Sequence, residues 1–214
     1  MINRRASISL IAALPALLTL PALLALPVGV VHPAQASTAG DRAAAFIKAT
    51  GAKLVAAINA TSGSPAQRRQ VVGEIIGSTV DVDGVARFCL GRFWRTATPA
   101  QQQQYQSLFR TMLIVNIASK LGDYQGVTFT VGATQDREAG EIVSTVIARP
   151  NNAPTNIQWL VANATTDPKI IDVIAEGTSM RLTQRDDYAS FLSQHGYSVD
   201  ALIAALHNQL SQAG

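Results

Sequence analysis

The sequence predicts an α+β fold, in which helices pack around a curved, mainly antiparallel, four-stranded sheet. Apolar residues recur at helical spacing through residues 41–123. Between residues 127 and 175, four short segments either alternate apolar and polar residues or are continuously apolar, as is typical of strands. A helical pattern returns over 185–211. Because helices and strands are segregated along the chain instead of alternating, the order favours α+β over a parallel α/β fold.

The first 36 residues predict a cleavable secretory signal. Arg4 and Arg5 precede an apolar run over 8–31, and Ala-Gln-Ala at 34–36 supplies the small residues of a cleavage site. A retained transmembrane anchor is the alternative, since the run approaches spanning length. Prolines that interrupt or closely follow the run favour the signal: Pro15, Pro21, Pro27 and Pro33. We therefore expect a signal peptide at 1–36 and one exported, soluble domain at 37–214.

Three helices are expected at the start of this domain. Asp41 is a plausible cap for the first, over 41–60. Ser64 followed by Pro65 predicts the start of the second, over 65–77. Asp81 or Asp83 then caps a short helix that ends near Leu90.

The next helix, over 98–123, has the clearest start. Thr98, Pro99 and Gln101 occupy the cap, first and third positions of a capping box. Its apolar stripe is wide and rich in bulky residues, so we expect this helix to be central.

Four strands are expected over 127–131, 142–148, 156–161 and 170–175. Short turns join them, which predicts an antiparallel meander. Helices follow over 185–195 and 198–211, the last capped by Ser198.

Composition gives little support for several classes of function. Removing the leader leaves 15 basic against 14 acidic residues, so nucleic acid is not an expected partner. The one cysteine, Cys89, lies in an apolar helical context and is expected to be structural and buried. His195 and His207 have no cysteine or carboxylate at ligand spacing, so neither a metal site nor a cofactor is expected.

The sequence contains no nucleophile elbow, phosphate loop or dinucleotide fingerprint. Asp172 and Glu176 are the one carboxylate pair suited to acid–base chemistry, and a periplasmic enzyme that uses them is an alternative function. The apolar residues exceed what one narrow core needs, and strands such as 170–174 are apolar on both faces. Either a filled two-layer core or a hollow between the sheet and the long helix is consistent with this excess.

Four segments resemble the MlaC family. Residues 87–101 (RFCLGRFWRTATPAQ) are similar to its LGRYWRTATPEQ segment, and 105–124 are similar to its following helix. Residues 171–180 resemble its DVxVEGVSM strand end, and 183–188 resemble the QRxxF motif that follows it. The resemblance covers about 42–207 and extends to the toluene-tolerance and HpnM-like, hopanoid-associated members.

This resemblance implies a periplasmic carrier of phospholipid, or of a hopanoid, whose fold encloses an apolar lipid cavity. It also implies two protein partners, an MlaA-like outer-membrane lipoprotein complex and an MlaD-like component of an inner-membrane ABC transporter, and a role in outer-membrane lipid asymmetry. A protein-only adaptor is a further alternative. Arg92 and Arg95 are candidates for meeting a headgroup or a partner. The expected lipid-lining residues come from the central helix and the inner face of the sheet: Phe109, Met112, Leu113, Val127, Phe129, Val131, Ile142, Val146, Ile157, Trp159 and Ile174.

Overall fold

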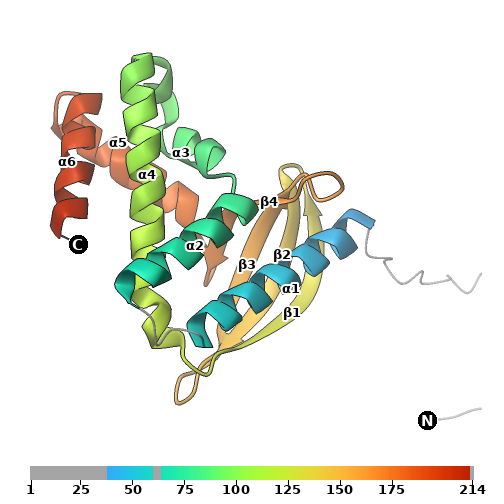
Figure 1. Cartoon of the computed structure of the whole chain (residues 1–214). Coiled ribbons are helices and arrows are strands. Elements are labelled where there is room, and N and C mark those ends of the chain that lie inside the picture. The colour runs from blue at the N-terminus through green and yellow to red at the C-terminus, as the bar shows by residue number, and fades with distance from the viewer. Residues whose placement is uncertain (1–37, 60–63, 213–214) are drawn as a thin grey trace, which may run out of the picture. The chain divides into compact units, whose positions relative to one another are not determined.

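The computed structural model describes residues 38–59 and 64–212, which belong to one compact unit (Figure 1). The predicted leader, 1–36, lies outside the described residues. None of the helices in the described ranges has the length and apolar character that a membrane span requires.

Local capping chemistry sets the starts of α2 and α3. In α2 (Pro65–Thr79), the Ser64 hydroxyl accepts from the Gln67 amide at 3.3 Å, and the Gln67 side chain accepts from the Ser64 amide at 2.8 Å. Asp81 caps α3 (Val82–Leu90) by accepting from the Gly84 amide. The first helix, α1 (Thr38–Asn59), begins earlier than predicted, so that Asp41 lies within its first turn and is not its cap.

The remaining helices surround the predicted central one. A short 3₁₀ helix, η1 (Gly91–Arg95), leads into α4 (Pro99–Lys120), whose capping box joins Thr98 and Gln101 as predicted. A second 3₁₀ helix, η2 (Leu121–Tyr124), follows. The last two helices are α5 (Met180–Gln194) and α6 (Val199–Gln212). Ser179 caps α5, which begins five residues before the predicted start, and Ser198 accepts from the Ala201 amide at the start of α6.

The sheet is an antiparallel meander, as predicted, with one short strand more than the four expected. Its order is β1-β2-β3-β4-β5, with bounds Thr128–Arg137, Gly140–Ala148, Thr155–Ala162, Lys169–Ala175 and Thr178–Ser179. Irregular pairing at Val131/Thr134 and at Leu160/Val161 interrupts the ladder, and such bulges increase twist and bending. Glu176 and Gly177 form the tight turn into β5, both with positive φ.

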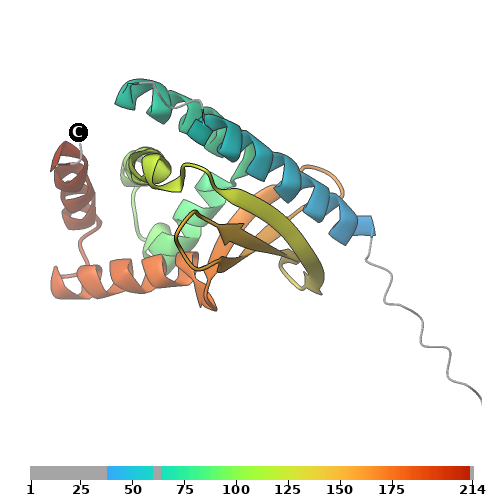
Figure 2. The ribbon, with the colours of Figure 1, turned by 90° about the horizontal axis from the view of Figure 1, so that it is seen from below.

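Helices cover the sheet unevenly. Helix α1 packs along β1 and β2 on one face of the sheet, and α3 and α5 contact β4 (Figures 1 and 2). Helix α4 packs against α2, α3 and α6. The core therefore has two parts: a helical cluster around Tyr105, and a smaller cluster between α1 and the sheet that includes Ile47, Val143 and Val161.

Candidate functional site

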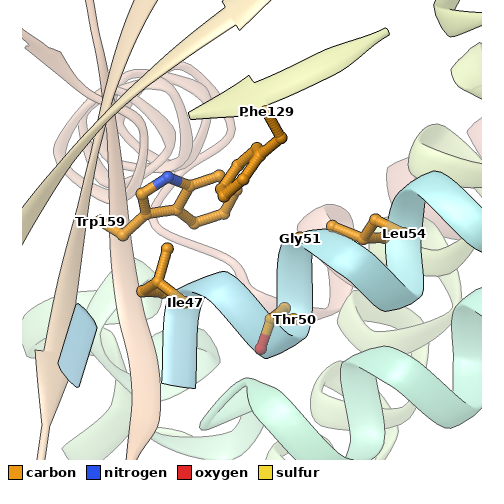
Figure 3. A pocket seen from close by; sticks show the side chains of 6 residues that line it. All are labelled: Ile47, Thr50, Gly51, Leu54, Phe129 and Trp159. Atoms are coloured by element: carbon orange, nitrogen blue, oxygen red, sulfur yellow. The ribbon is translucent and has the colours of Figure 1, made fainter. Parts of the chain in front are cut away.

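An apolar pocket lies between α1 and the face of the sheet that α1 covers (Figure 3). Helix α1 supplies four of its lining residues, and β1 and β3 supply one aromatic residue each. The four positions on α1 recur at spacings of three and four residues, which places them on one side of the helix. The lining residues are Ile47, Thr50, Gly51, Leu54, Phe129 and Trp159, and none of them is charged.

Gly51 allows the Phe129 ring to approach the backbone of α1. A Cβ atom at position 51 would lie 2.5 Å from Cε1 and 2.6 Å from Cδ1 of Phe129. Glycine inside a helix costs about 1 kcal/mol relative to alanine, so this position gives up helix stability for close packing. The contact seats the middle of α1 against the aromatic wall of the pocket.

The Trp159 side chain is fixed by a short hydrogen-bond chain. Its indole Nε1 donates to the Thr145 hydroxyl at 2.9 Å, and that hydroxyl donates to the Ile157 carbonyl at 3.0 Å. The Phe129 and Trp159 rings lie 6.3 Å apart, tilted by 58°. Because the indole N–H is satisfied within the sheet, Trp159 contributes an apolar surface to the pocket.

The lining side chains close on one another and leave no room for even a water molecule between them. In this arrangement the pocket is a packed apolar contact and holds no acyl chain, since ligand sites span about 300–1,000 Å³. Most contacts of α1 with the sheet are apolar. At its N-terminal end, Arg42 donates to the Thr165 carbonyl in the β3–β4 turn at 2.8 Å. Residues such as Leu54 lie toward the opposite end of the helix.

The structure places four of the predicted lining residues on the pocket face of the sheet. Phe129 and Trp159 line the pocket itself. Val131 and Ile157 both pair with Thr145, whose hydroxyl holds the Trp159 indole, so they share this face.

Three predicted residues lie on the face of the sheet opposite α1, and their contact with lipid stays a prediction. Ile142 pairs with Leu160, Val146 pairs with Asn156, and Ile174 pairs with Gln158. These pairs alternate with the pairs of the pocket face. Val146 is 39% exposed. The inward residues of β2 are instead Val143 and Thr145, both buried.

The remaining four predicted residues belong to the helical cluster. This cluster buries Phe109, Met112 and Val127, and Leu113 packs against it. None of the four lines the pocket. We expected the long helix to face the sheet across a hollow, whereas α1 takes that place. Gly51 was the available signal, because a glycine inside a helical pattern costs stability that close packing can offset.

The carboxylate pair of the alternative, enzymatic function is not arranged as an acid–base pair. Asp172 is buried, and it accepts from Ser179 Oγ at 2.6 Å and from the Arg181 amide at 3.1 Å. Its Oδ2 also lies 3.4 Å from Arg181 Nε, an ion-pair contact. Glu176 is exposed in the β4–β5 turn. Asp172 thus links β4 to α5.

The Cys89 thiol lies 3.6 Å from the Arg181 carbonyl, close to this network. Burial raises the pKa of Cys89 to about 12, which keeps the thiol protonated and unreactive at neutral pH. Within the described ranges, no three His, Cys, Asp or Glu residues come together as a metal-binding group.

Three comparisons with known proteins agree. Residues 47–208 match the MlaC protein family. The toluene tolerance protein Ttg2D of Pseudomonas putida is 26% identical over 145 residues, which are 66% of this chain and 67% of that protein. The phospholipid-binding protein of Ralstonia solanacearum, solved in complex with a phospholipid, has the same fold: the TM-score is 0.72 at 24% identity, covering 80% of this chain and 98% of that one.

Proposed function

Because this chain belongs to the MlaC family, we propose that it binds a phospholipid in the periplasm, with an acyl chain held between α1 and the sheet. The observation that carries the proposal is the uncharged pocket formed by α1, Phe129 and Trp159. The proposed cargo agrees with the phospholipid bound by the Ralstonia protein of the same fold.

The hydrophobic effect supplies the binding energy. Burying one CH₂ group is worth about 0.8 kcal/mol, so several methylene groups of an acyl chain provide substantial affinity without a charged side chain. The indole N–H of Trp159 is already paired with Thr145, which leaves the aromatic wall free to contact methylene groups.

Entry of the chain requires α1 to move away from the sheet, because the lining residues are in contact and leave no space for an acyl chain. The hydrogen bond of Arg42 to Thr165 favours a movement that is larger at the Leu54 end of the helix. Apolar contacts between α1 and the sheet are then replaced by contacts with the acyl chain. Since both arrangements bury apolar surface, the free-energy difference between them is small compared with either burial alone.

The MlaC family consists of lipid-binding transport proteins and not of enzymes. The structural engagement of Asp172 agrees with this, since its carboxylate oxygens are occupied by Ser179 and Arg181. We propose that the chain carries its phospholipid between an MlaA-like outer-membrane lipoprotein complex and an MlaD-like component of an inner-membrane ABC transporter.

The binding part of the proposal is tested by extracting lipid from the purified protein and identifying it by mass spectrometry. We expect phospholipid to copurify with the native protein and to be strongly reduced in Gly51→Leu, which places a side chain in the pocket. Gly77→Leu is the matched control, because Gly77 is a helical glycine with nothing within 4 Å of its Cβ position. Absence of phospholipid from the native protein, or equal content in both variants, contradicts the proposal. A hopanoid in the extract would identify a different cargo.

The transport part needs a separate measurement. Protein loaded with labelled phospholipid is mixed with vesicles that contain the purified inner-membrane transporter or lack it. Transfer that depends on the transporter supports the carrier function. Stable binding without such transfer contradicts it and leaves the binding function intact.

A further inference from the structure

Three exposed arginines on η1 and α5 have no carboxylate partner among the described residues: Arg92, Arg95 and Arg185. Three other basic residues, Arg110, Lys169 and Arg181, do form ion pairs. We call the three arginines, with Tyr197, the arginine surface.

The arginine surface is continuous. Side chains three residues apart in a 3₁₀ helix eclipse one another, so Arg92 and Arg95 lie on the same side of η1. The Arg92 guanidinium lies over the Tyr197 ring at 5.7 Å. Arg185 reaches η1 from α5, because a Cβ built on Gly91 would lie 3.2 Å from Arg185 Nε.

Aromatic rings hold two of these guanidinium groups. Arg92 also lies over Phe93 at 4.9 Å, and Arg185 lies over Phe88 at 5.1 Å. A guanidinium stacked on a ring keeps its N–H edge available, and that edge matches the oxygens of a phosphate in bidentate geometry. Stacking therefore holds these charges in place while their donors stay accessible.

Large apolar side chains are exposed near the same arginines. Tyr197 is 56% exposed, and Leu182, three residues before Arg185 on the same side of α5, is 49% exposed. Asp187 is turned about 200° away from Arg185, whereas Asp186 lies one helical turn beyond Leu182 and borders this surface. Unpaired arginines beside exposed tyrosine and aliphatic groups are the combination that suits an anionic bilayer surface.

We propose that the arginine surface docks the protein on a bilayer that contains anionic phospholipid. Arg92, Arg95 and Arg185 bind lipid phosphates, while Tyr197 and Leu182 enter the headgroup region. This docking is separate from the cargo pocket, which is lined by α1, β1 and β3.

Flotation of the purified protein with vesicles tests the proposal. We expect binding to phosphatidylglycerol vesicles, little binding to phosphatidylcholine vesicles, and release by salt. Each neutralised arginine should weaken binding about fivefold, so Arg92→Gln/Arg95→Gln/Arg185→Gln should lose it. A control, Arg69→Gln/Lys120→Gln/Arg137→Gln, removes the same charge from other exposed positions and should retain most of the binding.

A second variant covers the case in which the triple substitution fails to fold. Leu182→Asp changes one exposed side chain and should also reduce binding to phosphatidylglycerol. Equal losses in the triple variant and its charge control, insensitivity to headgroup, or no vesicle binding would overturn the proposal. So would association of the arginine surface with an acidic protein but not with vesicles. Lipid content measured on the same samples keeps this result distinct from the test of the cargo pocket.

Discussion

Ser179 Oγ donates a 2.6 Å hydrogen bond to Asp172 Oδ2 and joins β4 to the start of α5. The same hydroxyl accepts from the Leu182 amide at 3.2 Å and so caps the helix. Arg181 adds its backbone amide and its guanidinium to the Asp172 carboxylate. One buried carboxylate therefore fixes the angle at which α5 leaves the sheet.

Asp172→Asn should destabilise the fold, because it leaves the largely buried Arg181 guanidinium without its charge partner. Breaking such a pair costs about 3 kcal/mol or more. Urea unfolding measures the loss, and Glu176→Gln serves as the control because Glu176 is exposed. If both variants unfold at the same urea concentration as the native protein, the proposed role of Asp172 is incorrect.

Gly51→Ala and Gly77→Ala should change stability in opposite directions. Both residues lie in helices, where alanine is favoured over glycine by about 1 kcal/mol. At Gly77 the new methyl group meets nothing within 4 Å, so the helix is stabilised. At Gly51 it would overlap the Phe129 ring, so α1 or Phe129 must shift. Thermal melts of the two variants give the comparison, and stabilisation at both positions would show that the Phe129 contact is not tight.

Met112→Trp and Val146→Trp should separate the helical core from the exposed face of the sheet. Met112 is buried among the helices, so overpacking should cost about 1–3 kcal/mol. Val146 is 39% exposed and should accept tryptophan with little change. Neither variant should alter the amount of bound lipid, since neither residue lines the pocket. Reduced lipid content in folded Val146→Trp would show that the outer face also binds cargo.

Stability should fall in alkaline solution. Burial raises the pKa of Cys89 from 9.0 to about 12 and also raises the pKa values of Tyr105 and Tyr188. A group whose pKa is higher in the folded state stabilises the fold fully below its unfolded pKa and loses this contribution as pH rises through the folded value. The Cys89 contribution is thus lost between pH 9 and 12, by about 1.4 kcal/mol per pH unit. The free energy of unfolding, measured in urea, should fall less between pH 8 and pH 10 in Cys89→Ala than in the native protein. An equal fall in the two proteins would contradict this assignment.

Local chemistry made the starts of several helices predictable from the sequence. Ser64 with Gln67 and Thr98 with Gln101 satisfy backbone amides within four residues of each other. Such contacts depend little on the rest of the fold. The start of α5 was missed because Ser179 is positioned by a two-residue strand and by Asp172 on the preceding strand, seven residues earlier.

The sequence was less informative about which side chains of β2 face inward and about which helix packs on the sheet. Strand β2 has apolar residues on both faces: Ile142 and Val146 on one, Val143 and Ile147 on the other. Alternation of apolar and polar residues therefore does not show which face is inward. The polar Thr145 lies on the inward face and is buried. Helix α4 has the wider apolar stripe, yet it packs among helices, while Gly51 lets α1 approach the sheet closely. Which helix covers the sheet depends on tertiary packing that periodicity does not encode.

Quenching of tryptophan fluorescence by phospholipid with brominated acyl chains tests the central claim most directly. The chain has two tryptophans, Trp94 in η1 and Trp159 in the pocket. Trp94→Phe leaves Trp159 as the reporter, and Trp159→Phe leaves Trp94. We predict strong quenching in Trp94→Phe and little in Trp159→Phe, because the acyl chain contacts the Trp159 indole. Equal quenching in the two variants, or none in Trp94→Phe loaded with lipid, would contradict an acyl chain between α1 and the sheet.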